Sequence, residues 1–357
     1  MKVLLLGGST GQRGGVEAFC NRAQKALALY GPHEVHHQNA DTAFLSIGKL
    51  PGLVKGMANL ARKRSETDCL WLQYSNLPDL FYLPWAKLLG FRTVVTPHLG
   101  ANWKSQSNPR LRTLSNRLLR MADRIALLSP TQKNELSLPE NVPQTSLRTF
   151  LAGNALAAKE PSEPAPTDLL RLTHVSRLSE GKGTFHFVEV CRLLKQRDIK
   201  FSATIVGSAD NATLQRLTEA IAAAGLSDQI ALLGSLNEEQ YTDVLRNSDA
   251  VVHLSTVDSF PLIVLEAIAC AAFPICIDLA GATSMINTYA GHLVPEQNCA
   301  ALTADYLATK PLNELRSEAE TAGERVRADY GWATCVSALD RTLQDTVETP
   351  AAERAAA

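Results

Sequence analysis

The chain has 357 residues, of which 45% are hydrophobic and 20% are charged, a composition typical of a globular protein with a large apolar core. Lysine and arginine number 35 against 36 aspartates and glutamates, and the net charge of −1 excludes a protein that is basic throughout, as many nucleic-acid-binding proteins are. The seven cysteines form no C-x-x-C pair and no Cys/His cluster with zinc-ligand spacing, which indicates a reducing compartment and no metal site.

The first apolar run of the chain ends at Gly7 and is too short for a signal peptide. Nowhere does the sequence contain the stretch of about 20 apolar residues that a membrane-spanning helix needs. We therefore expect a cytoplasmic protein, and peripheral contact with the inner face of the cytoplasmic membrane remains open.

Short apolar runs alternate with longer helical stretches along the first half of the chain. The predicted strands are 3–6, 34–37, 69–74, 93–96, 124–128 and 145–150, and the clearest helices are 16–30 and 110–121. Buried strands that alternate with helices predict a parallel sheet with helices on both faces.

A proline-containing segment, residues 151–168, precedes a second set of alternating elements. Its predicted strands are 170–175, 201–206, 229–233, 250–254, 273–277 and 292–294, and its clearest helices are 184–196, 212–224, 238–247 and 262–270. The sequence therefore predicts two Rossmann-like, doubly wound α/β domains, which would face each other across a cleft. The expected divisions are an N-terminal domain 1–152, a linker 153–167, a C-terminal domain 168–325, a helix 326–346 that packs back towards the N-terminal domain, and a tail 347–357. Ligands of such sheets bind beyond the carboxyl ends of the strands.

A glycine-rich turn, residues 7–15, follows the first predicted strand. Glycines let the backbone approach a ligand closely, and the N-terminus of the next helix offers free N–H groups to an anion. The spacing does not fit the dinucleotide fingerprint G-x-G-x-x-G. The turn is therefore either an anion-binding loop or a turn that only requires positive φ angles.

Two cations, Arg177 and Lys182, lie in the loop that follows the strand predicted at 170–175. They can converge on one anion, most naturally a diphosphate, because arginine offers a planar fork and lysine a point charge. The alternative is two solvated surface charges.

Two carboxylates, Asp258 and Glu266, follow the strand predicted at 250–254. A carboxylate can accept hydrogen bonds from two sugar or ribose hydroxyls at once. Acid pairs at this spacing also arise by chance, but Glu266 stands in an apolar stretch, and a glutamate is seldom buried without a partner. We therefore expect Glu266 to face a ligand.

The order of motifs R-L-S-E-G-K-G (177–183), I-V-G (205–207), L-L-G (232–234) and D-S-F-P-L-I-V-L-E-A-I-A (258–269) resembles the donor domain of a known family. The family is the retaining glycosyltransferases of the GT-B fold, glycosyltransferase family 4 (glycosyl transferases group 1). The resemblance is specific over about residues 170–295. In the first half, G-G-V-E (14–17) is similar to the glycine loop of that family, and T-P-H (96–98) to its donor-site histidine.

The resemblance implies a nucleotide-sugar site. Arg177 and Lys182 would bind the diphosphate, and Glu266 the ribose hydroxyls. Asp258, in place of the usual glutamate, would contact the donor sugar with a reach shorter by one methylene. The other implied contacts are backbone N–H groups near Gly14, Gly15, Phe260, Pro261 and Leu262, the base near Ser235 and Leu236, and His98 beside the transferred sugar. Leu99 stands where the family often has an acid, which bears on the role of His98.

The resemblance leads us to expect a metal-independent, retaining hexosyltransferase that uses a UDP- or GDP-sugar and needs no cofactor. The two cations and helix N-termini would stabilise the departing diphosphate. The acceptor would be a hydroxyl of a saccharide, lipid-linked, in the assembly of a bacterial surface polysaccharide (lipopolysaccharide or exopolysaccharide) or a glycolipid.

Two basic amphipathic segments of the first domain favour such an acceptor, because they could dock on an anionic membrane. Their cations are Lys49, Lys55, Arg62, Lys63 and Arg64 in the first segment and Arg110, Arg112, Arg117, Arg120 and Arg124 in the second. The alternative is two ordinary solvated helices.

Two other functions stay open. One is an NAD(P)-dependent sugar-nucleotide reductase or epimerase, because G-G-S-T-G (7–11) resembles the opening of short-chain dehydrogenases and Tyr306 and Lys310 match Y-x3-K. The other is a catalytically degenerate nucleotide-sugar-binding protein, because Asp258 departs from the family pattern.

Overall fold

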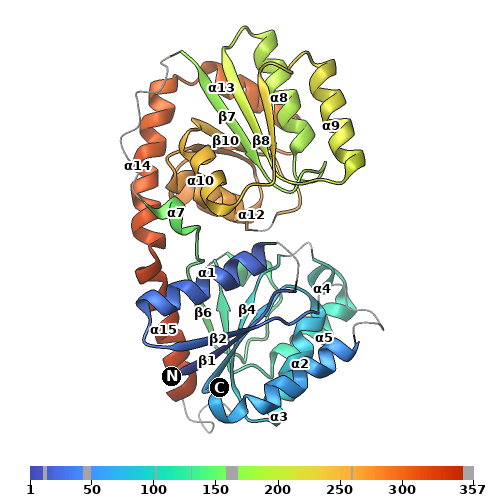
Figure 1. Cartoon of the computed structure of the whole chain (residues 1–357), viewed down its shortest axis with the longest axis vertical. Coiled ribbons are helices and arrows are strands. Elements are labelled where there is room, and N and C mark those ends of the chain that lie inside the picture. Colours follow the sequence, from blue (N-terminus) through green and yellow to red (C-terminus); the bar gives the residue numbers. More distant parts are fainter. Residues whose placement is uncertain are drawn as a thin grey trace. The chain divides into compact units, whose positions relative to one another are not determined.

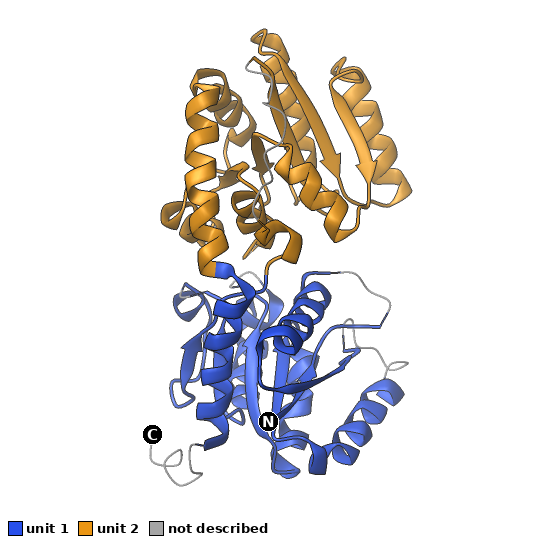
Figure 2. Ribbon diagram, turned by 60° about the vertical axis from the view of Figure 1, so that its left-hand side comes forward, with its two compact units in different colours: residues 1–150, 330–357 blue, residues 151–329 orange. Residues whose placement is uncertain are grey.

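The computed structural model describes residues 1–10, 14–42, 50–100, 103–129, 131–157, 168–258 and 260–348. The chain divides into two compact units, one formed by residues 1–150 and 330–357 and the other by residues 151–329 (Figure 2). The second unit thus begins before, and ends after, the domain expected at 168–325.

The first unit is built on a parallel sheet that has six strands within the described residues, in the order β2-β1-β3-β4-β5-β6. The strands are β1 (Lys2–Leu6), β2 (Glu34–Gln38), β3 (Cys69–Tyr74), β4 (Arg92–Pro97), β5 (Arg124–Leu127) and β6 (Gln144–Ser146). The prediction of a strand at 145–150 is wrong beyond Ser146. At the end of that stretch Phe150 leaves the sheet and its ring packs edge-on against Phe19, with the ring centroids 5.7 Å apart.

Helices and 3-10 turns of the first unit lie between the strands, and one helix comes from the end of the chain (Figure 1). They are α1 (Gly15–Tyr30), α2 (Leu50–Arg62), η2 (Arg64–Glu66), η3 (Leu77–Phe81), α3 (Tyr82–Leu88), α4 (Lys104–Ser107), α5 (Pro109–Leu119), α6 (Gln132–Glu135) and α15 (Trp332–Glu348). Helix α15 buries Cys335, Val336, Leu339 and Leu343 in the same apolar cluster as Phe19 and Trp71. The C-terminal segment therefore completes the core of the first unit.

The second unit has a parallel sheet of six strands within the described residues, in the order β12-β11-β10-β7-β8-β9. The strands are β7 (Leu170–Val175), β8 (Phe201–Val206), β9 (Ile230–Gly234), β10 (Ala250–His253), β11 (Phe273–Ile277) and β12 (His292–Val294). Four of them coincide with the predicted ranges. Strand β9 forms the sheet edge, which leaves Leu232 and Leu233 37% and 45% exposed.

Between β7 and β12 the helices of the second unit connect consecutive strands, as parallel pairing requires, and further helices precede β7 and follow β12. They are α7 (Gly153–Leu156), α8 (Thr184–Gln196), α9 (Asn211–Ala223), α10 (Glu238–Arg246), α11 (Leu262–Ala269), α12 (Ala280–Thr288), α13 (Cys299–Thr309) and α14 (Leu312–Tyr330). The segment expected as a linker thus starts with a short helix, α7, and its remainder from residue 158 to 167 lies outside the described residues.

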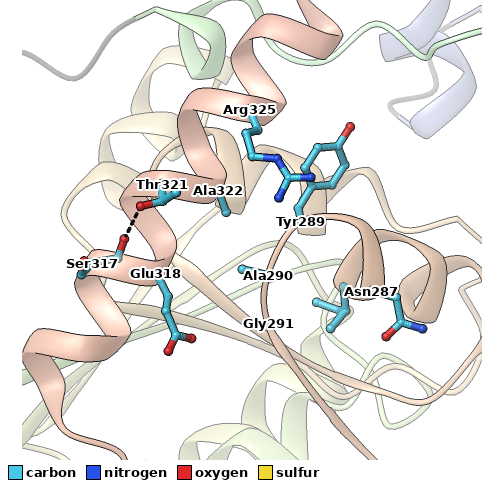
Figure 3. Close-up of a pocket in the computed structure, with 10 residues that line it drawn as sticks. Asn287, Tyr289, Ala290, Gly291, Ser317, Glu318, Thr321, Ala322 and Arg325 are labelled. Carbon is cyan, nitrogen blue, oxygen red and sulfur yellow. Dashed lines mark hydrogen bonds between the residues drawn. The ribbon is translucent and has the colours of Figure 1, made fainter.

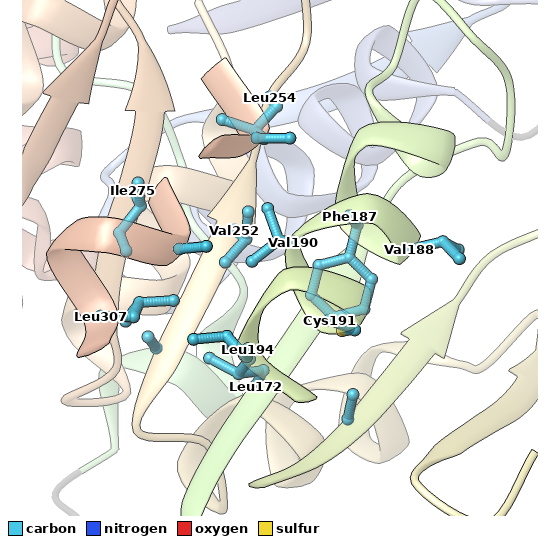
Figure 4. Packing of buried hydrophobic residues seen from close by; sticks show 14 of the residues in the cluster. Leu172, Phe187, Val188, Val190, Cys191, Leu194, Val252, Leu254, Ile275 and Leu307 are labelled. Carbon is cyan, nitrogen blue, oxygen red and sulfur yellow. The ribbon is translucent and has the colours of Figure 1, made fainter. Parts of the chain in front are cut away.

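The core of the second unit combines one face of the sheet with the apolar faces of its helices. Leu172, Val252 and Ile275 from three neighbouring strands pack against Phe187 and Leu194 of α8 (Figure 4). These side chains are almost fully buried. Such packing holds the ends of the central strands in fixed positions, and the candidate site lies at those ends.

Among the described residues, no helix combines the length and apolar character that crossing a bilayer would demand. The described residues also contain no group of three or more His, Cys, Asp or Glu side chains placed to hold a metal ion.

Candidate functional site

The loop between β7 and α8, residues 176–183, carries both Arg177 and Lys182. It is fixed on one side by the strand end of β8, where the Leu178 N–H donates to the Ser208 carbonyl at 2.8 Å. On the other side it is fixed by the segment after β10, where the Thr256 N–H donates to the Gly181 carbonyl at 3.0 Å. The loop is therefore bound to the carboxyl ends of both neighbouring strands, β8 and β10, which flank β7 in the sheet (Figure 1).

Two glycines allow this close packing of backbones. Gly183 has a φ of +76°, and a Cβ atom there would lie 2.2 Å from the Leu254 carbonyl oxygen. Gly207 has a φ of +148°, and its Cβ would lie 1.7 Å from the Ser176 carbonyl oxygen. Both positions combine a backbone conformation that side chains disfavour with a backbone neighbour that leaves no space. The R-L-S-E-G-K-G loop thus needs glycine for packing as well as for turning.

A buried histidine, His174, supports the loop from below, and sequence reasoning missed it. Its Nδ1 lies 3.0 Å from the Val252 carbonyl, and its Nε2 lies 2.9 Å from Ser176 Oγ and 3.1 Å from Thr184 Oγ1. Burial lowers the pKa of His174 to about 4, so the ring is neutral at physiological pH. A neutral ring that donates from Nδ1 accepts at Nε2, so the hydroxyl of Ser176 or of Thr184 can donate to it.

Lys182 and Asp258 meet at the carboxyl ends of the strands of the second sheet, the end that we call the carboxyl edge. The Lys182 ammonium forms an ion pair with Asp258 Oδ1, and the two side chains are 20% and 22% exposed. The other carboxylate oxygen of Asp258 accepts a hydrogen bond from Nε2 of His253 at 2.9 Å. Burial alone would raise the pKa of Asp258, but the hydrogen bond from His253 and the charge of Lys182 hold it below its usual range. Asp258 is thus an ionised carboxylate with a basic group on each side.

Arg177 is exposed, and within the described residues its guanidinium makes no hydrogen bond or ion pair. It belongs to the same loop as Lys182, which leads into α8 at Thr184. Helix α11 also begins near this edge, after Pro261 as its N-cap, with no side chain capping its first N–H groups. Two helix N-termini and two cations give this edge an electropositive character suited to an anion.

Glu266 is buried in α11, with 4% of its surface exposed. Its Oε1 accepts a hydrogen bond from the Ala152 N–H at 3.2 Å, and its Oε2 accepts one from the Tyr241 hydroxyl at 3.1 Å. The partners explain how a carboxylate is tolerated in an apolar helix.

The remaining residues expected in the second unit follow β9 and β10 along the chain. Ser235 is exposed after β9, and Leu236 is half-buried beside it. Phe260 and Leu262 are half-buried and Pro261 is buried at the start of α11.

In the first unit, Gly14 is the N-cap of α1 and Gly15 its first residue, and both are exposed. The described part of the turn also contains a carboxylate, because Glu17 Oε1 accepts a hydrogen bond from the Ser9 N–H at 2.9 Å. Residues 11–13 lie outside the described residues. One of the free N–H groups of the turn is therefore satisfied by the chain itself.

His98 follows β4 and is partly buried against Phe19, with the two ring centroids 4.7 Å apart. Its Nε2 lies 2.9 Å from Gln73 Oε1. Burial lowers the pKa of His98 to about 3, so the ring is neutral at physiological pH. It can act through hydrogen bonds and shape but carries no charge.

The dehydrogenase-like pair is engaged elsewhere. The Tyr306 ring stacks on His292, with centroids 3.8 Å apart, and the Lys310 ammonium lies 2.6 Å from Glu318 Oε1. His292 begins β12, at the amino edge of the sheet. The pair is thus built into the packing at the opposite edge from the loop of Lys182.

A groove of about 470 Å³ lies between the end of α12 and α14 (Figure 3). Arg325 donates to the Thr288 carbonyl at 2.8 Å, and its guanidinium carbon lies 5.4 Å from the centre of the Tyr289 ring. Helix α12 runs back from the carboxyl end of β11 to the start of β12, so the groove is at the amino edge as well. It is separate from the candidate site.

Two α/β units, each built on a parallel sheet, with cations after β7 and acids after β10 of the second sheet, define a two-domain protein of the GT-B glycosyltransferase fold. The structure resembles the Anabaena protein HepE, solved in complex with UDP-glucose, with a TM-score of 0.74 and 16% sequence identity over 97% of this chain and 100% of that one. The fold predicted from the sequence is therefore confirmed.

Residues 157–325 match the model of the family described as glycosyl transferases group 1. This segment of the chain is therefore similar to that family.

Curated relatives match over part of the chain. The gpi3 subunit of phosphatidylinositol N-acetylglucosaminyltransferase from Schizosaccharomyces pombe is 26% identical over 191 residues, 52% of this chain and 41% of the relative. The amylovoran biosynthesis glycosyltransferase AmsK of Erwinia amylovora is 31% identical over 142 residues, 38% of this chain and 34% of the relative. The aligned part thus spans less than half of the length of each relative.

Proposed function

We propose that the protein is a retaining glycosyltransferase that moves a hexose from a nucleoside diphosphate sugar to a hydroxyl of a saccharide. The observation that carries the proposal is the contact of Lys182, in the loop that also carries Arg177, with Asp258, within the segment that matches glycosyl transferases group 1. A diphosphate and a sugar hydroxyl are the two chemical groups that a cation and a carboxylate so placed would bind together. UDP is the first nucleotide to test, because HepE was solved with UDP-glucose, and GDP is the second.

In this proposal Arg177 and Lys182 bind the diphosphate. Charge builds on the diphosphate as the bond to the sugar breaks, so cations and helix N-termini that are already in place stabilise the transition state more than the bound donor. The ammonium of Lys182 has three protons and can hold Asp258 and a phosphate oxygen at once. These groups would take the place of a metal ion.

The remaining contacts belong to the same proposal. Asp258 accepts hydrogen bonds from hydroxyls of the donor sugar, and Glu266 accepts hydrogen bonds from the hydroxyls of the ribose. The base lies near Ser235 and Leu236. The first N–H groups of α11, beside Phe260, Pro261 and Leu262, contact the diphosphate.

From the first unit, Gly14, Gly15 and His98 would approach the donor. Because His98 is neutral, it would serve as a hydrogen-bonding partner of the transferred sugar. Retention of configuration would come from attack of the acceptor on the face that the diphosphate leaves, since Asp258 and Glu266 are engaged in hydrogen bonds and are poor nucleophiles.

For the acceptor we propose a lipid-linked saccharide at an anionic membrane, in the assembly of a surface polysaccharide. On α5, Arg110, Arg112 and Arg117 are exposed, and on α2 the exposed side chains include Lys55 and Val54, the latter 64% exposed. Basic and apolar side chains that are exposed together suit the surface of an anionic bilayer.

Not all of the basic residues are available for this contact. Arg64 donates to the carbonyls of Leu89 and Gly90, and Arg124 donates to Thr145 and Thr346. Both hold the fold together. Lys49 lies outside the described residues.

The proposal is tested by thermal unfolding in the presence of UDP, GDP, their sugars and NAD(P). A nucleotide at 100 times its dissociation constant stabilises the folded state by about 2.7 kcal/mol. We expect one nucleoside diphosphate and its sugar to raise the melting temperature and NAD(P) to leave it unchanged. Stabilisation by NAD(P) alone would contradict the proposal and support a reductase. Binding of a nucleotide sugar without transfer to any saccharide would indicate a degenerate binding protein.

A further inference from the structure

We propose that His253 is a positioning residue that fixes the carboxylate of Asp258 for contact with the donor sugar. The proposal rests on the proposed function and adds a residue to its site. His253 is the last residue of β10, and Asp258 lies in the loop that follows. Its Nε2 donates to Asp258 Oδ2 at 2.9 Å, and its side chain is 5% exposed.

The direction of the strand explains why this ring reaches the loop. Val252 and Leu254, on either side of His253, point into the apolar cluster of the second unit. Side chains alternate along a strand, so the imidazole of His253 leaves the opposite face of the sheet. There its Nδ1 is buried and has no hydrogen-bond partner within the described residues. Asp258 is accordingly the polar contact that orients the ring.

The two partners of Asp258 have different tasks. Lys182 pairs with Oδ1, and His253 donates a hydrogen bond to Oδ2. When the Lys182 ammonium also binds a diphosphate, its ion pair with Asp258 weakens, because one positive charge then interacts with two anions. His253 lies behind the carboxylate and is too buried to contact the donor itself. It therefore keeps Asp258 in one rotamer while Lys182 changes partners.

The test compares two substitutions of His253. His253→Phe fills the space of the ring but removes the N–H group that donates to Asp258, whereas His253→Gln can place its amide N–H near the position of Nε2. Because a displacement of about 1 Å can cost a hundredfold in rate, we expect His253→Phe to lower kcat about tenfold to a hundredfold, with the KM for the nucleotide sugar and the Kd for the nucleoside diphosphate changed less than about threefold. His253→Gln should recover most of kcat. His292→Gln, a half-buried histidine at the amino edge, is the matched control and should behave as the wild type.

Several results would overturn the inference. One is a kcat of His253→Phe equal to that of the wild type. Another is no recovery in His253→Gln together with lost nucleotide binding, which would mean that the ring only supports the fold.

A separate readout does not depend on turnover. In ¹⁵N spectra of the wild-type protein, the Nε2-bound proton of His253 should be protected from exchange, and Asp258→Ala should shift it. If no donor is turned over, the proposed function fails, and this signal still decides whether His253 holds Asp258. An Nε2–H signal of His253 at the same position in Asp258→Ala as in the wild type would refute the contact.

Discussion

Replacing Gly183 by alanine tests whether close backbone packing positions the cation loop. Gly183 has a φ of +76°, and its new Cβ would lie 2.2 Å from the Leu254 carbonyl oxygen, whereas ordinary contacts begin at 3.4 Å. The loop and the end of β10 must therefore separate by about 1 Å. Alanine in the left-handed region costs about 1 kcal/mol, and forced overpacking costs about 1 to 3 kcal/mol more. We expect Gly183→Ala to lower the free energy of unfolding by about 2 to 4 kcal/mol.

The same displacement moves Lys182, the neighbour of Gly183, away from Asp258. A shift of about 1 Å at a reacting group can cost a hundredfold, so kcat/KM for the nucleotide sugar should fall about a hundredfold.

The matched control is Gly225→Ala. Gly225 has a φ of +66°, but the nearest atom to its Cβ would be the flexible Lys195 Nζ at 3.5 Å. We expect Gly225→Ala to lower the free energy of unfolding by only about 1 kcal/mol and to leave kcat/KM unchanged. Denaturant unfolding and steady-state kinetics measure both effects. If Gly183→Ala matched Gly225→Ala in stability and turnover, the packing argument would be refuted.

Two further predictions concern stability and membrane binding. Asp249 is buried and accepts hydrogen bonds from Arg171 and Arg316; burial alone would raise its pKa, but the two arginines hold it below the usual range. The ionised carboxylate therefore stabilises the fold above the pKa that Asp249 has in the unfolded chain, and this stabilisation is lost as the pH falls. We expect Asp249→Asn to lower the free energy of unfolding by about 3 kcal/mol at pH 7 and by progressively less below about pH 4, measured by denaturant unfolding. A difference between variant and wild type that did not change with pH would contradict this prediction. In liposome flotation, reversing Arg110, Arg112 and Arg117 to glutamate should abolish binding to anionic vesicles, since each arginine contributes about 1 kcal/mol. Reversing the charges of the exposed Lys195, Arg197 and Lys200 should leave vesicle binding unchanged. If the two triple variants reduced vesicle binding equally, the membrane proposal would be refuted.

The fold was largely predictable because buried parallel strands leave a strong local signal. The runs at β7, β8 and β11 are short, apolar and bounded by turn residues, so their predicted and observed limits coincide. Strand β6 was overextended because the apolar residues Leu147 and Phe150 are buried outside the sheet. Sequence pattern reports burial but does not say which partner covers a side chain.

The candidate site was predictable in part for the same reason. Strand order brings the loops after β7 and β10 together, so the meeting of Lys182 and Asp258 follows from the topology. The partners of Glu266 could not be foreseen, because Ala152 is 114 positions away in the sequence. His174 and His253 did leave a signal, since each is a titratable residue inside an apolar strand that precedes a candidate loop.

The central claim is that Lys182 binds the diphosphate of the donor. It is tested most directly by the single-turnover rate of sugar transfer, or of donor hydrolysis, for Lys182→Ala against Lys200→Ala. Lys200 is an exposed lysine immediately before β8, at the amino edge of the same sheet. We expect Lys182→Ala to lose about a hundredfold to a thousandfold in rate and Lys200→Ala to keep the wild-type rate. A wild-type rate in Lys182→Ala, with the donor bound as before, would contradict the account.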